Sequence, residues 1–154
     1  MIYGLTYLGV IHTLISLVAV AAALVAFARE GAINPGNTLG KLYIWTTVLT
    51  CLTGFGIFQH GGFGKPHALG VITLVVLATA WKLTSPKIIT VLYSLTFLFH
   101  MIPAVTETST RLPLGAPWLK DAEAPELKAI TGVLFLLFLA GVTLQLRRLK
   151  AQGK

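Results

Sequence analysis

Apolar residues are concentrated in five long segments, and most charged residues fall in the stretches between them. The segments cover approximately residues 3–28, 42–58, 67–81, 88–104 and 127–146. An α-helix rises about 1.5 Å per residue and a bilayer has a hydrocarbon core of about 30 Å, so about 17 apolar residues barely cross it. The pattern predicts five membrane-crossing helices, and the long first helix is expected to tilt or protrude.

A short polar stretch, residues 82–87, separates the third segment from the fourth. Ser85 is suited to capping a helix, Pro86 to its first turn, and the lysines at both ends of the stretch to an aqueous edge. We therefore predict two helices joined by a tight turn. The longest connection, residues 106–126, is expected at the opposite side, where it could cover the mouth of a pocket.

Composition supports a membrane protein. The chain has 154 residues, of which 55% are hydrophobic and 11% charged, and its mean hydropathy is +0.81. No soluble domain of ordinary composition has these values. We predict an all-α fold, a polytopic membrane helical bundle of about five transmembrane helices, with residues 1–154 forming a single integral membrane domain in contact with the lipid bilayer.

The distribution of basic residues predicts the orientation. With the N-terminus outside, the inner side holds eight of them and the outer side four. The inner set is Arg29, Lys41, Lys82, Lys87, Arg147, Arg148, Lys150 and Lys154, and the outer set is Lys65, Arg111, Lys120 and Lys128. The positive-inside rule favours this arrangement, N-outside and C-inside, which needs an odd number of spans. Nucleic-acid binding is not expected, because the basic cluster directly follows the last span, where anionic lipid explains it.

All four histidines fall on the predicted outer side. From the helical rise, His12 lies about 13 Å and His100 about 7 Å below the outer ends of their segments. His60 and His67 flank a glycine-containing turn at the headgroup boundary. Because ionisable residues inside apolar helices are rare and costly, these histidines are candidates for a functional site.

Polar residues recur at helical spacing on two of the segments. Thr46, Thr50, Thr53 and His60 follow one face of the second, with Tyr43 one turn earlier, and Tyr93, Thr96, His100 and Glu107 follow one face of the fourth. Such spacing predicts that each set shares one side of its helix. We expect these faces to point into the bundle.

The predicted spans supply paired neutral imidazoles and contain no carboxylate in their interiors. This set of donors favours haem iron. We predict a b-type haem held by His12 and His100 as axial ligands near the outer leaflet, with Lys65, Arg111 or Lys120 pairing with the propionates. Cys51 is the single cysteine, which excludes covalent attachment through a C-x-x-C-H motif. The expected function is electron transfer, with a quinone or a redox protein as partner.

Two alternatives stay open. A metal site for Zn or Cu at the outer surface would use His60, His67, His100 and Glu107, since imidazoles suit both metals. In the other alternative, the histidines only pack or bind a partner, and the protein is a non-enzymatic accessory or structural module. No nucleophile, base and acid form a recognisable arrangement, so the sequence leaves an enzymatic activity undecided.

Several motifs resemble a known family. They are His12, the run Leu39, Gly40, Lys41, Leu42, Tyr43, the run from Leu52 to Phe58, and Lys65, Pro66, His67, Ala68, Leu69. Together they resemble the DUF2306-type family of small bacterial membrane proteins over the first three helices. The resemblance implies a helical protein of the bacterial cytoplasmic (inner) membrane, a first-helix histidine at His12 and a G-x-x-Y step at Gly40 and Tyr43. Asn37 and Thr38 stand where members often carry a histidine and a basic residue. The family has no assigned activity.

Overall fold

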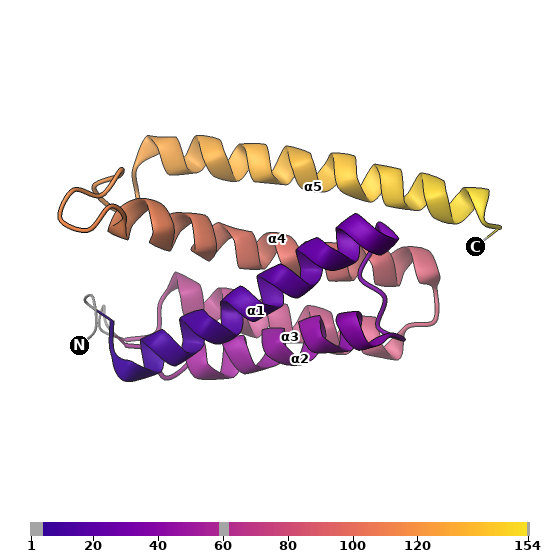
Figure 1. Ribbon diagram of the computed structural model, residues 1–154, viewed down its shortest axis with the longest axis horizontal. Helices are drawn as coiled ribbons and strands as arrows, with labels where there is room; N and C mark the ends of the chain where they lie inside the picture. Colours follow the sequence, from indigo (N-terminus) through magenta and orange to yellow (C-terminus); the bar gives the residue numbers. More distant parts are fainter. Residues whose placement is uncertain (1–4, 59–61, 154) are drawn as a thin grey trace.

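The computed structural model describes residues 5–58 and 62–153, and these residues form five α-helices (Figure 1). They are α1 (Tyr7–Glu30), α2 (Thr38–Gly54), α3 (Lys65–Lys82), α4 (Pro86–Arg111) and α5 (Pro125–Ala151). Each corresponds to one of the five apolar segments, so the all-helical prediction is confirmed. Successive helices run in opposite directions along the length of the molecule (Figure 1).

Local side-chain contacts determine where the first two helices begin. The Thr6 side chain accepts a hydrogen bond of 3.0 Å from the Gly9 N–H at the start of α1. Asn37 accepts one of 2.8 Å from the Gly40 N–H, and α2 therefore begins at Thr38, one turn before the predicted start. Both are ordinary N-caps, which satisfy amide groups that have no partner inside the helix.

The turn between α3 and α4 lies where the sequence predicts it, with Pro86 as the first residue of α4. Ser85 occupies the cap position but its side chain makes no capping hydrogen bond. The far end of α4 differs from the prediction, because the helix continues through Pro103 to Arg111. Glu107 and Arg111 form an ion pair one turn apart, which stabilises the added turns.

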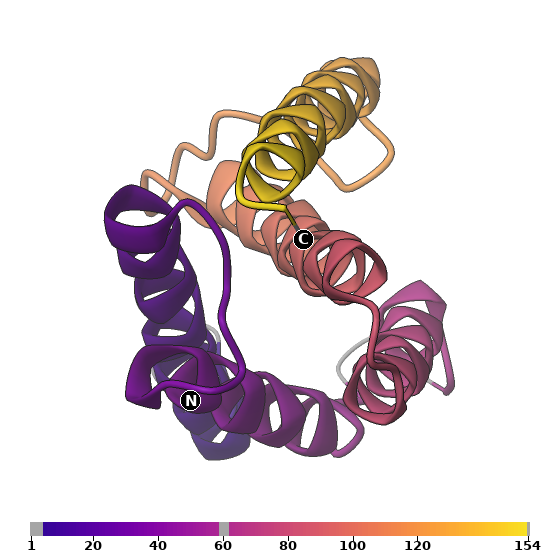
Figure 2. The ribbon, with the colours of Figure 1, turned by 90° about the vertical axis from the view of Figure 1, so that its right-hand side faces the viewer.

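The first four helices form an open ring and α5 packs on its outside (Figure 2). α1 makes its most extensive contact with α2, α2 contacts α3, α3 contacts α4, and α4 returns to a smaller contact with α1. α5 packs against α4. Small side chains permit the close approach of α1 to its neighbours, since Ala19, Ala22, Ala23 and Ala26 are buried in one cluster with Tyr43.

The surface of this bundle is apolar. Among the described residues, α1, α4 and α5 are long and apolar enough to cross a membrane. Large hydrophobic side chains such as Trp45, Trp81 and Leu136 are more than half exposed. In water such a surface would drive association, whereas in a bilayer it contacts acyl chains. The protein is therefore a membrane protein, while the count of five spans and the orientation stay predictions.

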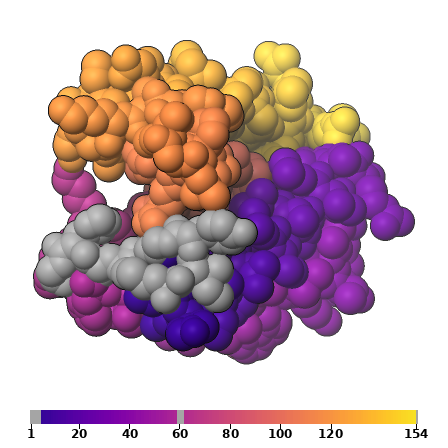
Figure 3. All heavy atoms as spheres, turned by 60° about the vertical axis from the view of Figure 1, so that its left-hand side comes forward, coloured from indigo at the N-terminus to yellow at the C-terminus, as the bar shows by residue number. Residues whose placement is uncertain are grey.

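The two ends of the bundle carry different charges. The basic end, where α1, α3 and α5 finish, holds Arg29, Lys41, Lys82, Lys87, Arg147, Arg148 and Lys150, with Glu30 as the carboxylate among its described residues. The loop end holds the α4–α5 connection, residues 112–124, and carries charges of both signs. Figure 3 shows this connection, in orange, projecting above the start of α1, in indigo.

Candidate histidine site toward the loop end

His12 lies on α1 and reaches the neighbouring helix α2. Its Nδ1 is 3.1 Å from Thr53 Oγ1. Gly54 makes this approach possible, because a Cβ at that position would lie 3.2 Å from His12 Cε1. The ring is half-buried between the two helices.

The hydrogen bonds of Thr53 determine the tautomer of His12. The Thr53 hydroxyl donates to the Leu49 carbonyl over 2.8 Å and is 3.1 Å from the Thr50 carbonyl. Its hydrogen is thereby used, so Thr53 Oγ1 accepts from His12 Nδ1–H. A neutral imidazole carries one N–H, and His12 Nε2 therefore has a free lone pair. This arrangement, with one ring nitrogen donating to the protein, is typical of histidines that ligate a metal through the other.

His100 lies on α4 and is buried, with 6% of its surface exposed. Its Nε2 has no hydrogen-bond partner among the described residues. Buried polar groups without a partner are uncommon and are costly to leave in an apolar environment. The ring of Tyr43 lies beside it, with the two centroids 6.4 Å apart.

His12 and His100 lie on helices that contact each other, because α4 returns to a smaller contact with α1. The predicted pair therefore comes from two neighbouring helices.

The polar face predicted for α4 is confirmed in its inner part. Tyr93, Thr96 and His100 are buried, whereas Glu107 lies beyond the core and is exposed. On α2, Tyr43 and Thr50 are buried, while Thr46 and Thr53 are half-buried.

His67 has a different role, which its hydrogen bond defines. It lies in the first turn of α3, where its Nδ1 accepts a hydrogen bond of 3.2 Å from the Gly64 N–H, the contact that an N3 side chain makes in a capping box. The proton is therefore on Nε2, which has no partner among the described residues. Phe58 and Phe63 lie against the ring, with centroids 5.0 and 5.2 Å away. In this tautomer His67 is a helix cap and offers no lone pair at Nε2.

Two of the three cations predicted to pair with haem propionates, Lys65 and Arg111, form ion pairs with carboxylates. Lys65 Nζ lies 2.7 Å from Glu123 Oε1, which joins the start of α3 to the α4–α5 connection. Arg111 pairs with Glu107 on α4. Both cations lie at the loop end, on the same side of the bundle as His12 and His100.

The four-residue metal site stays a prediction, because His60 lies outside the described residues. Within residues 5–58 and 62–153, no group of three or more His, Cys, Asp or Glu side chains is close enough together to hold a metal ion. Glu107 faces its ion-pair partner Arg111.

A buried polar pair that was not predicted from the sequence lies between α4 and α5. Ser94 Oγ donates to Gln145 Oε1 over 2.8 Å, and both side chains are buried. The signal was present, since Gln145 is an amide within an apolar segment, where polar side chains need a partner. Its partner could not be predicted without knowing that α5 packs on α4.

No family model, curated protein or solved structure matches this chain. The resemblance to the DUF2306-type family therefore stays a prediction, and function has to be argued from the side chains.

Proposed function

We propose that the protein binds a b-type haem through His12 and His100 and transfers electrons within a bacterial inner membrane. The observation that carries the proposal is the buried Nε2 of His100, which makes no hydrogen bond among the described residues, together with the contact between α4 and α1, the helix that carries His12. A buried His100 nitrogen without a partner is explained if the nitrogen has a ligand.

The donor set fits haem better than it fits a hydrolytic metal ion. Haem iron accepts two imidazoles from facing helices, and its apolar macrocycle suits an apolar bundle. Catalytic zinc sites commonly include a carboxylate or place one nearby. The carboxylate predicted for such a site, Glu107, is already paired with Arg111. The hydrogen bond from His12 to Thr53 would orient the first ligand, and the packing of Tyr43 beside His100 would restrain the second.

Haem, when bound, would supply one-electron redox chemistry, and the protein residues would hold and orient it. Its propionates would require cations at the loop end, for which Lys65 and Arg111 are the candidates. Their present ion pairs are largely exposed to solvent, and such pairs contribute little to stability. Replacing Glu123 or Glu107 by a haem propionate as the partner of these cations would therefore cost little free energy. A quinone or a redox protein would be the partner that accepts or delivers the electron.

Haem titration of the purified protein tests this proposal. Apoprotein in detergent is titrated with haemin and the absorption spectrum is recorded for the wild type, His12→Ala, His100→Ala and His67→Ala. We expect one haem per chain in the wild type and in His67→Ala, because His67 is a cap whose Nε2 carries a proton. Each of the other two variants should lose the six-coordinate spectrum.

Other outcomes contradict the proposal and select an alternative. If the wild type binds no haem but retains stoichiometric zinc or copper, the histidines form a metal site. If it retains neither, the protein is a membrane accessory module with packing histidines. If His67→Ala alone abolishes haem binding, the ligand pair is wrong.

A further inference from the structure

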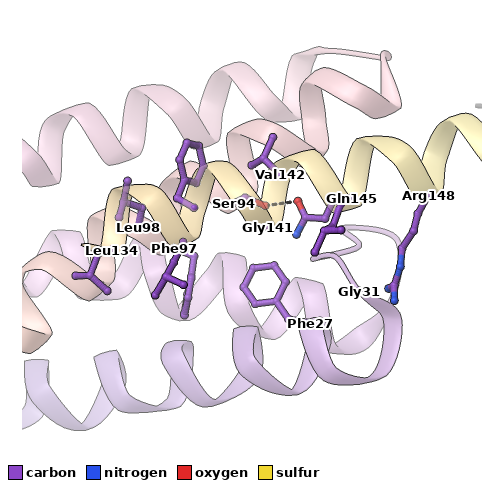
Figure 4. Close-up of a pocket in the computed structure, with 13 residues that line it drawn as sticks. Phe27, Gly31, Ser94, Phe97, Leu98, Leu134, Gly141, Val142, Gln145 and Arg148 are labelled. Carbon is purple, nitrogen blue, oxygen red and sulfur yellow. Dashed lines mark hydrogen bonds between the residues drawn. The ribbon is translucent and has the colours of Figure 1, made fainter. Parts of the chain in front are cut away.

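A cavity of about 400 Å³ lies between the end of α1 and the facing sides of α4 and α5, toward the basic end (Figure 4). Phe27 packs edge-on against Phe97 in its wall, with ring centroids 5.1 Å apart. Leu134 and Phe138 line it from α5. None of the described histidines lines this cavity, so it is separate from the proposed haem site.

A polar group interrupts the apolar wall. Gln145 lines the cavity and its Oε1 accepts the hydrogen bond from Ser94 (Figure 4). Its amide nitrogen makes no hydrogen bond to any other described residue. Since that nitrogen carries two hydrogens, Gln145 can donate to an acceptor inside the cavity.

Arg148 lines the same cavity one helical turn beyond Gln145, at the basic end. Its guanidinium lies against the backbone of Gly31. The approach is so close that a Cβ added to Gly31 would lie 1.9 Å from Arg148 Nη1. The described carboxylate at this end, Glu30, accepts hydrogen bonds of 2.7 Å from Asn37. Among the described residues, therefore, no carboxylate forms an ion pair with Arg148.

We propose that this cavity binds one anionic phospholipid. Three chemical groups follow one another along one side of α5: a guanidinium at Arg148, an amide donor at Gln145, and an apolar wall from Phe138 to Leu134. A phospholipid presents the complementary groups in the same order, as a phosphate, an ester carbonyl and an acyl chain. A fatty acid lacks the ester that would reach Gln145, and a quinone lacks the anion that would pair with Arg148.

Length and charge agree with this occupant. From Arg148 to Leu134 the axis of α5 extends about 21 Å, which is comparable to one leaflet, whose hydrocarbon half is about 15 Å deep. The excess of cations over carboxylates at the basic end attracts anionic headgroups. Basic pockets between membrane helices on the predicted cytoplasmic side are typical sites for such lipids.

Native mass spectrometry of delipidated protein tests the proposal. The protein in detergent is titrated with dioleoyl phosphatidylglycerol, with dioleoyl phosphatidylcholine and with inorganic phosphate as a competitor. We expect one phosphatidylglycerol per chain, bound at least about tenfold more tightly than phosphatidylcholine, because the choline cation of phosphatidylcholine offsets its phosphate charge and is repelled by the cations of the basic end. Inorganic phosphate should not compete, because it lacks the acyl chain.

Two matched variants identify the headgroup contact. Arg148→Gln should raise the Kd for phosphatidylglycerol about tenfold, because loss of one charge-assisted hydrogen bond weakens binding by about this factor. Arg147→Gln removes the same charge from a neighbouring position that does not line the cavity, and should leave the affinity unchanged. Equal losses in both variants would show only diffuse attraction of anionic lipid and would overturn the proposal.

A third variant fills the cavity from within. Gly141 lines it, and a Cβ there would meet no atom within 4 Å. Gly141→Phe should therefore fold normally and displace the acyl chain, which would abolish phosphatidylglycerol binding even if Arg148→Gln unfolds. Unchanged binding in Gly141→Phe, equal affinity for both lipids, or competition by inorganic phosphate alone would each overturn the proposal.

Discussion

The hydroxyl of Tyr43 donates a hydrogen bond of 2.8 Å to Thr96 Oγ1, and both side chains are fully buried. The direction follows from Thr96, whose own hydrogen is donated to the Tyr93 carbonyl over 2.8 Å. Thr96 is one helical turn from His100, on the same face of α4. This contact joins α2 to α4 one helical turn from His100.

Removal of this hydroxyl should destabilise the protein modestly. Tyr43→Phe keeps the ring and leaves Thr96 bonded to its own helix, so the expected loss is about 1 kcal/mol. For a chain of this size that corresponds to a fall in Tm of roughly 2–4 °C, measured by thermal unfolding in detergent. Tyr7→Phe is the matched control, because Tyr7 is 74% exposed, and should not change Tm. An equal fall in both variants would show that the buried bond contributes nothing.

Thr53 is predicted to control haem affinity through His12. Thr53→Val keeps the shape of the side chain but removes the acceptor for His12 Nδ1–H. Loss of such an orienting partner typically lowers metal affinity about 10–100-fold, which a haem titration would measure. Thr46→Val is the control, since among the described residues Thr46 Oγ1 bonds to its own helix alone, at the Leu42 and Tyr43 carbonyls. If both variants bind haem like the wild type, Thr53 does not orient a ligand.

The hydrophobic pattern was sufficient to predict all five helices, because each apolar segment has to satisfy its backbone internally in a bilayer. Helix ends were less predictable. α2 begins at the Asn37 cap and α4 continues to the Glu107–Arg111 ion pair. Both depend on single side-chain contacts, which add only fractions of a kcal/mol to about one kcal/mol.

For the candidate site, helical spacing correctly placed Tyr93, Thr96 and His100 on a buried face. The roles of the individual histidines could not be predicted in this way. His12 depends on Thr53 and His67 on Gly64, and only the first of these partners lies on another helix. Those hydrogen bonds determine which ring nitrogen keeps its lone pair. The spacing of residues within one helix does not reveal them.

The ion pair between Lys65 and Glu123 makes a prediction about pH. The hydrogen bond from Lys65, and then its charge, lowers the pKa of Glu123 below the ordinary value of 4.5. A lowered carboxyl pKa means that the pair favours the folded protein at neutral pH, and that this contribution disappears as the pH falls through the lowered pKa. A carboxyl titration by NMR should give a Glu123 midpoint below 4.5.

In Lys65→Gln the midpoint of Glu123 should rise toward the ordinary value, because the hydrogen bond and the nearest charge are gone. Lys128→Gln should raise it less, since Lys128 acts on Glu123 only through its charge and more weakly. The same midpoint in the wild type and Lys65→Gln would show that the pair does not form in solution.

Cysteine labelling tests the predicted orientation. In a Cys51→Ala background, which removes the single native cysteine, a new cysteine is placed at exposed Ala116 or at exposed Ala151. A membrane-impermeant maleimide added to intact cells should label Ala116→Cys, in the α4–α5 connection. Ala151→Cys, at the end of α5, should be labelled only after permeabilisation. Labelling of both in intact cells would show that α5 does not cross the membrane, and the reverse pattern would invert the orientation.

Electron paramagnetic resonance of the haem-loaded ferric protein tests the central claim most directly, because the signal reports the axial ligands of the iron. Two imidazoles from His12 and His100 predict a low-spin signal in the wild type that becomes high-spin when either histidine is replaced by alanine. A wild-type protein that retains no haem, or a low-spin signal that survives in both alanine variants, would contradict the account.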